Sequence, residues 1–359
     1  MNPSIYQYLC SLLAASISNT DCKLPPLTEN DWIALYKIAS RQGVLAIVYD
    51  AVKRLPVNAL PSRSLRLQWA LNVDRIERHY EMQFMRSKEL AEIFARYNIK
   101  TVVLKGLGLG AYYPFPQHRE CGDFDCYLCG EYNKGNKIAE QYCGAKVENC
   151  GYKHSHIEYK GLVVENHKFC IGIRGRKELS DMERYLENIL SSTDNYKCIP
   201  NTALLLPPAD FNAMFLSQHA SYHFLIEGIS LRHVCDWALF LKHEQNSVDW
   251  HLFYNLCEKY NLKRFVDVMT AISVEKLGVL IQNPLIHVYS PWVDKVFDNI
   301  MHGQPRVYSG VLGIWSSRWL ILKNMIQYRW KYSKIYNKNF MCEILYSIYA
   351  FLFKNKFEL

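Results

Sequence analysis

The chain has no apolar run long enough to cross a bilayer, because no stretch reaches the ~18 uninterrupted apolar residues of a spanning helix. No Lys or Arg precedes the apolar residues within 1–18, so this segment is not typical of a signal peptide and predicts an amphipathic helix. Low-complexity tracts and internal repeats are also missing, and 50% of the residues are hydrophobic. That composition excludes a disordered chain. We therefore expect a folded protein without a membrane span.

Cysteine is plentiful, with twelve in 359 residues, but its spacing lacks the pattern of a zinc ribbon. Cys126 and Cys129 form one Cys-x-x-Cys pair near Cys121, and no second such pair follows. A chain of this length has enough core to fold without disulfides. We therefore expect buried free thiols and a cytoplasmic protein.

The charge balance is only mildly positive, since 42 Lys and Arg residues exceed 34 Asp and Glu residues by eight. This excess suits an anionic ligand such as a nucleotide and is weak evidence for nucleic acid. The tail from about 304 carries nine Lys or Arg residues among aromatic ones, against Glu343 and Glu358. It predicts either a basic surface for nucleic acid or lipid headgroups, or a helical pair with a solvated basic face. We favour the helical pair.

Apolar periodicity divides the chain into three regions. Residues 1–98 have helical spacing, 99–200 hold the β-branched runs and turns of an α/β core, and 201–359 return to helical spacing. Strands are expected at 99–104, 123–128, 153–159 and 162–170. The predicted fold class is α+β, a small mixed sheet flanked by helical N- and C-terminal regions.

Two aspartates lie on one side of the expected strand 123–128. Asp123 and Asp125 are two residues apart, so their side chains leave the same face with Cα atoms ~6.6 Å apart. Such carboxylates repel one another unless a cation lies between them. Mg²⁺ prefers oxygen ligands and keeps positions open for phosphate oxygens. The pair predicts either a metal site for phosphate chemistry or two solvated aspartates at a strand end.

A hairpin offers a third carboxylate. If Lys160-Gly161 is a two-residue turn, His156 lies opposite Glu165, and His154 lies opposite His167. Opposed residues share a face, so this register separates a polar face from an apolar one with a single exception, Val163. The register therefore places Glu165 on a ligand-like face.

Two alternatives remain open for this hairpin. Glu158 shares the polar face of Glu165 but lies nearer the turn, where solvation is expected. The three histidines beside Glu165 also suggest zinc. We rank zinc below Mg²⁺ or Mn²⁺, because the Asp-x-Asp pair and Glu165 form an all-oxygen ligand set.

A series of short motifs follows in a fixed order: Val103-Leu-Lys-Gly106, Tyr113-Pro114, Arg119, Gly122-Asp-Phe-Asp125, Glu165-Asn-His167, His219-x-x-x-His223 and Leu231-Arg-His-Val-Cys-Asp236. The series resembles the uncharacterised bacterial nucleotidyltransferases of the polymerase-beta-like superfamily and covers roughly residues 60 to 245. The chain departs from the wider superfamily at two points. Lys105-Gly106 replaces the usual Gly-Ser or Gly-Gly, and Glu165 replaces the usual aspartate.

The resemblance implies a sheet of nucleotidyltransferase type and metal-dependent transfer of a nucleotidyl group from an NTP, ATP first, to an unknown acceptor. Mg²⁺ or Mn²⁺ would be bound by Asp123, Asp125 and Glu165. The phosphates would be positioned by Lys105, Gly106 and Arg119. The alternative is a catalytically degenerate scaffold that binds a nucleotide or a partner protein.

Supporting side chains are expected around this site. His156 and His167 would stand beside the ligands on the hairpin. Arg232 and Asp236 are four residues apart, so an intrahelical ion pair is available to them. Arg119 has a second interpretation, as a structural brace for Asp123.

Overall fold

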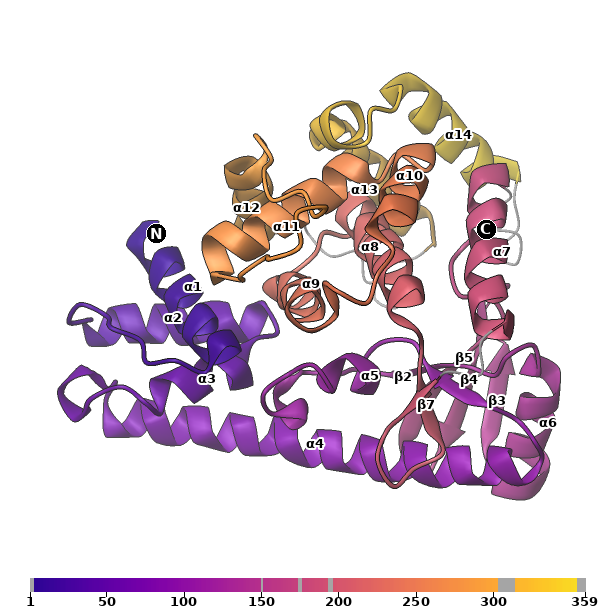
Figure 1. Ribbon diagram of the computed structural model, residues 1–359, viewed down its shortest axis with the longest axis horizontal. Coiled ribbons are helices and arrows are strands. Elements are labelled where there is room, and N and C mark those ends of the chain that lie inside the picture. Colours follow the sequence, from indigo (N-terminus) through magenta and orange to yellow (C-terminus); the bar gives the residue numbers. More distant parts are fainter. Residues whose placement is uncertain (1–2, 150, 174–175, 193–195, 303–313, 354–359) are drawn as a thin grey trace.

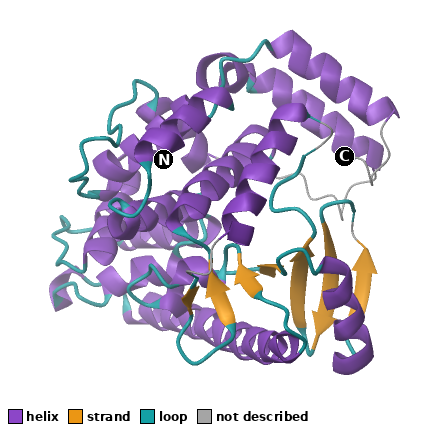
Figure 2. Ribbon diagram, turned by 45° about the vertical axis from the view of Figure 1, so that its right-hand side comes forward, coloured by secondary structure: helices purple, strands orange, loops and turns teal. Residues whose placement is uncertain are grey.

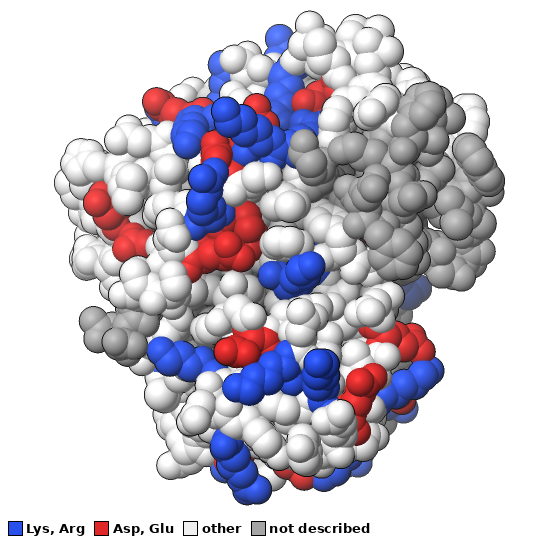
Figure 3. All heavy atoms as spheres, turned by 90° about the vertical axis from the view of Figure 1, so that its right-hand side faces the viewer, with Lys and Arg blue, Asp and Glu red and all other residues white. Residues whose placement is uncertain are grey.

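The computed structural model describes residues 3–149, 151–173, 176–192, 196–302 and 314–353. Within these ranges no helix is long and apolar enough to cross a membrane. The cysteines described there are free thiols. On the face in Figure 3, Lys and Arg side chains are interspersed with Asp and Glu side chains instead of forming one basic surface.

The N-terminal region is helical and ends in one long helix. It contains α1 (Pro3–Ser18), α2 (Glu29–Arg41), α3 (Leu45–Val52), the short η1 (Val57–Ala59) and α4 (Arg63–Arg96). Thr28 caps α2 in a reciprocal capping box with Asp31, and the Ser62 side chain caps α4. Helix α4 has 34 residues and runs beneath both the N-terminal helices and the sheet (Figure 1). It therefore joins the two parts of the molecule.

The sheet has seven strands in the order β3-β4-β5-β2-β1-β7-β6. Their bounds are Thr101–Val103 (β1), Phe124–Tyr127 (β2), Lys146–Asn149 (β3), His154–Tyr159 (β4), Leu162–His167 (β5), Lys197–Cys198 (β6) and Leu204–Leu206 (β7). The pairs β2–β5 and β1–β7 are parallel, and the others are antiparallel. The mixed sheet and the helices at both ends confirm the predicted α+β fold.

The remaining helices surround this sheet. They are α5 (Leu107–Gly110), η2 (Pro116–His118), α6 (Tyr132–Cys143), α7 (Lys177–Ser192), α8 (Ala209–Ile226), α9 (Leu231–Glu244), α10 (Trp250–Lys259), α11 (Lys263–Leu277), α12 (Val293–His302), α13 (Ile314–Gln327), the π-helical turn η3 (Lys331–Ile335) and α14 (Phe340–Phe353). Figure 2 sets the strands beside the long helix and below the C-terminal helices. Helices α13 and α14 contact one another, in line with a C-terminal helical pair.

The two faces of the sheet meet different partners. Phe124 and Cys126 are buried in a core that includes Phe94 of α4. Val102 and Tyr127 leave the opposite face and join the core that contains α8 and α9. The site residues of β2 alternate with Phe124 and Cys126, so they lie on this second face, toward the C-terminal helices.

The sequence prediction missed three strands. Strand β3 is short and mostly exposed, which leaves no apolar alternation to detect. Strands β6 and β7 have two and three residues, and Leu204–Leu206 was expected to begin a helix. Because β7 pairs with β1, the sheet continues beyond the boundary expected at residue 200.

Candidate active site

Strand pairing brings the second aspartate and the glutamate together. The hairpin has the expected register, with His156 opposite Glu165 and His154 opposite His167. Strand β5 then lies parallel to β2 and pairs Asp125 with Glu165. Residues in register on neighbouring strands share a face, so these two carboxylates stand side by side. Glu158 is exposed and in register with Lys146 on the outer strand β3.

His167 is the contact point between the two carboxylates. Its Nε2 is 3.0 Å from Asp125 Oδ1 and 3.4 Å from Glu165 Oε2, and its side chain is fully buried. Its Nδ1 lies 3.2 Å from the Phe169 carbonyl oxygen, which can only accept a hydrogen bond. Nδ1 therefore carries a proton. Nε2 faces the two carboxylate oxygens, a position that suits a hydrogen bond to them or, with a metal bound, a metal ligand.

The other hairpin histidines lie beside the same glutamate. His154 Nε2 is 3.7 Å and His156 Nε2 is 3.6 Å from Glu165 Oε1. One ligand atom each from His154, Glu165 and His167 lies within 4.8 Å of the others, a spacing that suits a shared metal ion. The histidines expected around Glu165 are thus gathered in space.

Lys105 forms an ion pair with one carboxylate of this cluster. Its Nζ is 2.7 Å from Asp125 Oδ1. Burial alone would raise the pKa of Asp125, but Lys105 and the hydrogen bond with His167 outweigh burial and hold that pKa well below its ordinary value. Mutual repulsion of carboxylates, expected from the Asp-x-Asp spacing, is therefore not the dominant effect at Asp125.

Asp123 behaves differently from Asp125. Partial burial and the neighbouring charges of Glu165 and Asp125 raise the pKa of Asp123. Glu165 lies between these cases: burial raises its pKa, while the His167 hydrogen bond and Lys105 outweigh burial and lower it. The cluster thus holds one carboxylate stabilised in its charged form beside one that is electrostatically crowded.

Gly106 forms the turn between β1 and α5. Its φ of 55° lies in the left-handed region, and an added Cβ would be 3.5 Å from the Asp123 carbonyl oxygen. Glycine is therefore the residue that suits this backbone. The turn places Lys105 next to the carboxylates.

Arg119 makes a bidentate ion pair with Asp236, 117 residues away. Its Nε and Nη2 are 2.9 Å and 2.8 Å from the two carboxylate oxygens, and both side chains are buried. Tyr113 adds a hydrogen bond of 2.8 Å from its hydroxyl to Asp236 Oδ1. The proposed brace to Asp123 was wrong, because the guanidinium is committed to Asp236.

The intrahelical ion pair that was available to Arg232 and Asp236 does not form. Arg232 instead donates from Nη1 to the Glu120 carbonyl oxygen at 2.9 Å. Both arginines thus connect α9 to the segment that leads into β2. These contacts fix the C-terminal helices against the carboxylate strand.

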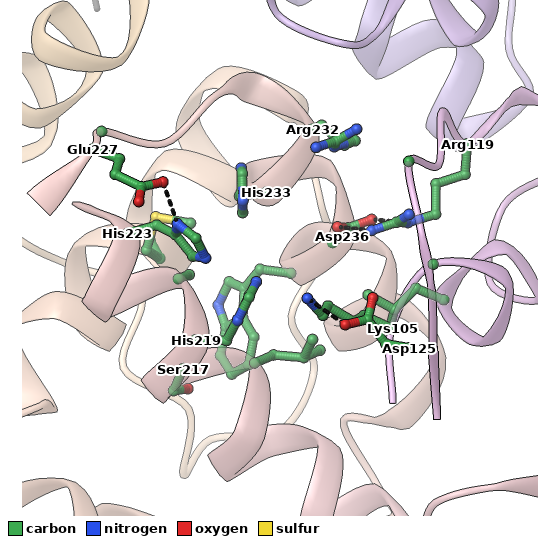
Figure 4. Close-up of a pocket in the computed structure, with 18 of the residues that line it drawn as sticks. Lys105, Arg119, Asp125, Ser217, His219, His223, Glu227, Arg232, His233 and Asp236 are labelled. Carbon is green, nitrogen blue, oxygen red and sulfur yellow. Dashed lines mark hydrogen bonds and ion pairs between the residues drawn. The ribbon is translucent and has the colours of Figure 1, made fainter. Parts of the chain in front are cut away.

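A cavity of about 340 Å³ opens between the two aspartates, Asp123 and Asp125, and the C-terminal helices. Figure 4 shows Lys105 and Asp125 at one side and the histidines of α8 and α9 facing them. The lining includes the expected residues Lys105, Gly106, Arg119, Asp123, Asp125, Arg232 and Asp236, whereas the expected residues Glu165, His156 and His167 do not line it. The ion pair of Arg119 with Asp236 lies at the junction of its two walls.

Sequence reasoning missed several residues here. Glu227 lines the cavity and was not predicted, and His233, which lies within the motif 231–236, lines it without having been given a role. Lys153 precedes β4, and its pKa is lowered by burial and by the charge of Lys105. The local sequence around Lys153 does not indicate that this side chain is buried near Lys105.

The comparisons with known proteins agree with the geometry. Residues 28–278 match a family described as uncharacterised nucleotidyltransferase. The match covers most of the chain, so the protein belongs to this nucleotidyltransferase family. No curated protein and no solved structure matches it.

Proposed function

We propose that the protein transfers a nucleotidyl group from an NTP, with ATP the first candidate, to an acceptor hydroxyl, using Mg²⁺ or Mn²⁺. The observation that carries this proposal is the parallel pairing of Asp125 with Glu165, next to a cavity that is lined by Lys105, Asp123 and Asp125. We place the reaction in the reducing cytoplasm, in keeping with the free thiols of the described residues.

The donor set fits a divalent cation. Lys105 already neutralises Asp125 at 2.7 Å, so the carboxylates accept a positive charge at this position. The His167 ring is oriented by the Phe169 carbonyl in the manner of a metal-binding imidazole. Asp123, Asp125 and Glu165 would hold Mg²⁺ or Mn²⁺, while His154 and His167 with Glu165 would suit a softer metal such as Zn²⁺. When bound, the metal would stabilise negative charge on the phosphates.

The protein's own cations have a separate role. Lys105 is one-fifth exposed and faces the cavity, so it can turn from Asp125 to a phosphate oxygen. Gly106 allows the backbone of the turn to approach the triphosphate closely. Arg119 lines the same cavity, and its ion pair with Asp236 holds this part of the cavity in place beside the phosphates. These residues would position the nucleotide for attack.

Pyrophosphate release tests the proposal. The purified full chain is incubated with each of the four NTPs and with Mg²⁺, Mn²⁺ or Zn²⁺, and pyrophosphate is measured. We expect metal-dependent release that Glu165→Gln abolishes and the matched control Glu158→Gln retains, because Glu158 is exposed on the same hairpin. Nucleotide binding without release by the wild type would favour the degenerate scaffold. Loss of release in Glu158→Gln alone would overturn the choice of Glu165.

A further inference from the structure

The wall of the cavity opposite the carboxylates consists of imidazoles above an apolar floor. His219 and His223 come from α8, and His233 comes from α9; their ring centroids lie 4.5–6.4 Å apart. The floor beneath them is contributed by α8, α9 and α11 through Leu216, Ala220, Trp237, Phe265, Val266 and Met269. The function proposed above uses none of these side chains.

The three rings differ in which ring nitrogen is occupied by a hydrogen bond. His223 Nδ1 donates to Glu227 Oε2 at 3.2 Å, which leaves its Nε2 as the free nitrogen. His233 Nδ1 accepts from the Ser230 backbone N–H at 3.2 Å, so its proton is on Nε2. Within the described part of the chain, no hydrogen bond occupies a ring nitrogen of His219. His219 therefore has a nitrogen available for a ligand.

His219 lies nearest the reacting end of the cavity. Figure 4 places its ring between His223 and the pair of Lys105 with Asp125. Burial and the charge of Lys105 lower the pKa of His219 well below its ordinary value. Burial together with the charge of Arg232 lowers the pKa of His233 in the same direction. Both rings are neutral at pH 7, so these two imidazoles present hydrogen-bonding groups without charge.

Resting on the function proposed above, we propose that this half of the cavity binds the acceptor, an uncharged hydroxyl group on an apolar body, and that His219 takes the hydroxyl proton. The hydroxyl oxygen bonds to the α-phosphorus as its proton passes to a His219 nitrogen. The bond from the α-phosphorus to the bridging oxygen breaks, and pyrophosphate leaves with that electron pair. His223 and Glu227 stand behind His219, and their increasing exposure, 28% and 42%, provides a route for the proton to solvent.

The position of the wall favours an acceptor over a nucleobase. The attacking oxygen must meet the α-phosphorus beside the metal-binding carboxylates, whereas a base extends away from its phosphates. A proton acceptor next to Lys105 and Asp125 is placed for the attacking group. The apolar floor then holds the rest of the acceptor by excluding water.

Two probes test this assignment on the full chain. Water serves as the acceptor when pyrophosphate release is measured without any other hydroxyl compound. We expect His219→Ala to lower kcat by about 10²–10⁴-fold with little change in the KM for ATP, and added imidazole to restore part of the rate. His251→Gln, an exposed histidine of α10, is the matched control with wild-type kinetics. A His219→Ala rate within threefold of wild type, or a loss that imidazole does not rescue, overturns the role of His219.

Benzyl alcohol probes the apolar floor and is followed by ligand-observed NMR and by product analysis. We expect it to bind, and either to become nucleotidylated or to inhibit the reaction with water. Ala220→Leu, which narrows the floor, should weaken its binding at least tenfold. Absence of binding, or competition of benzyl alcohol with ATP, overturns the acceptor subsite. Absence of pyrophosphate release from the wild type overturns the proposed function instead, whether or not benzyl alcohol binds. Asp123→Asn should lose pyrophosphate release and still bind benzyl alcohol.

Discussion

Replacing Asp125 by Asn separates the two electrostatic effects in the carboxylate cluster. In the folded protein Asp125 accepts charge-assisted contacts from Lys105 at 2.7 Å and from His167 at 3.0 Å, and its side chain is 7% exposed. Removing one partner of a buried pair costs about 3–5 kcal/mol, but Lys105 is 20% exposed and can regain water. We therefore expect Asp125→Asn to lower the free energy of unfolding by about 1–3 kcal/mol.

The matched control is Asp123→Asn. Asp123 is more accessible to solvent than Asp125, and its pKa is raised by partial desolvation and by repulsion from Glu165 and Asp125. Removing this charge relieves repulsion, so the stability should stay within about 0.5 kcal/mol of wild type or rise. Both variants should lose metal-dependent turnover, which shows that the difference in stability is not a difference in catalytic importance.

Urea unfolding followed by circular dichroism in metal-free buffer measures this contrast. The midpoint of Asp125→Asn should fall below that of Asp123→Asn, with similar slopes for both variants. A midpoint for Asp125→Asn at or above that of wild type would refute the reasoning. It would mean that repulsion among the carboxylates outweighs the contacts with Lys105 and His167.

Three further results are expected. Asp236→Asn leaves the Arg119 guanidinium buried without its partner and should lower the unfolding free energy by about 3–5 kcal/mol, while Arg119→Met with Asp236→Leu should regain much of it in the same urea assay. Burial lowers the pKa of His118, but its hydrogen bonds to Asp50 and Glu77 outweigh burial and raise it. The stabilisation from His118 is therefore complete below pH ~6.5 and is lost as pH rises through the folded-state pKa. In His118→Gln the melting temperature should change less between pH ~6 and ~9 than it does in the wild type. Chelation by EDTA should abolish pyrophosphate release and excess Mg²⁺ or Mn²⁺ should restore it; release that EDTA leaves intact would contradict a metal requirement.

The hairpin shows which parts of the site were predictable from sequence. A two-residue turn fixes the register of β4 and β5, and the polar and apolar faces leave only one register that buries Val164 and not Glu165. The placement of Glu165 beside Asp125 then needed only the pairing of β5 with β2. Local alternation was enough for the hairpin register because the paired residues of β4 and β5 lie within one supersecondary unit.

The wall opposite the carboxylates was less predictable. Arg119 and Asp236 meet across 117 residues, whereas the sequence spacing offered only Arg232 as a partner of Asp236. Lys153 immediately precedes β4, and the tertiary fold brings it near the site. No local sequence pattern predicts this position. Such contacts depend on how the helices pack on the sheet, and the periodicity of one segment does not encode that packing.

The bond broken in the nucleotide tests the central claim most directly. The wild-type chain is incubated with Mg²⁺ or Mn²⁺ and ATP labelled at either the α- or the γ-phosphate, and the products are separated. A nucleotidyltransferase places the α-label on the acceptor or, with water, in AMP, and it releases the γ-label as pyrophosphate; Asp123→Asn should do neither. Transfer of the γ-label to the acceptor, or its release as inorganic phosphate, would contradict the account.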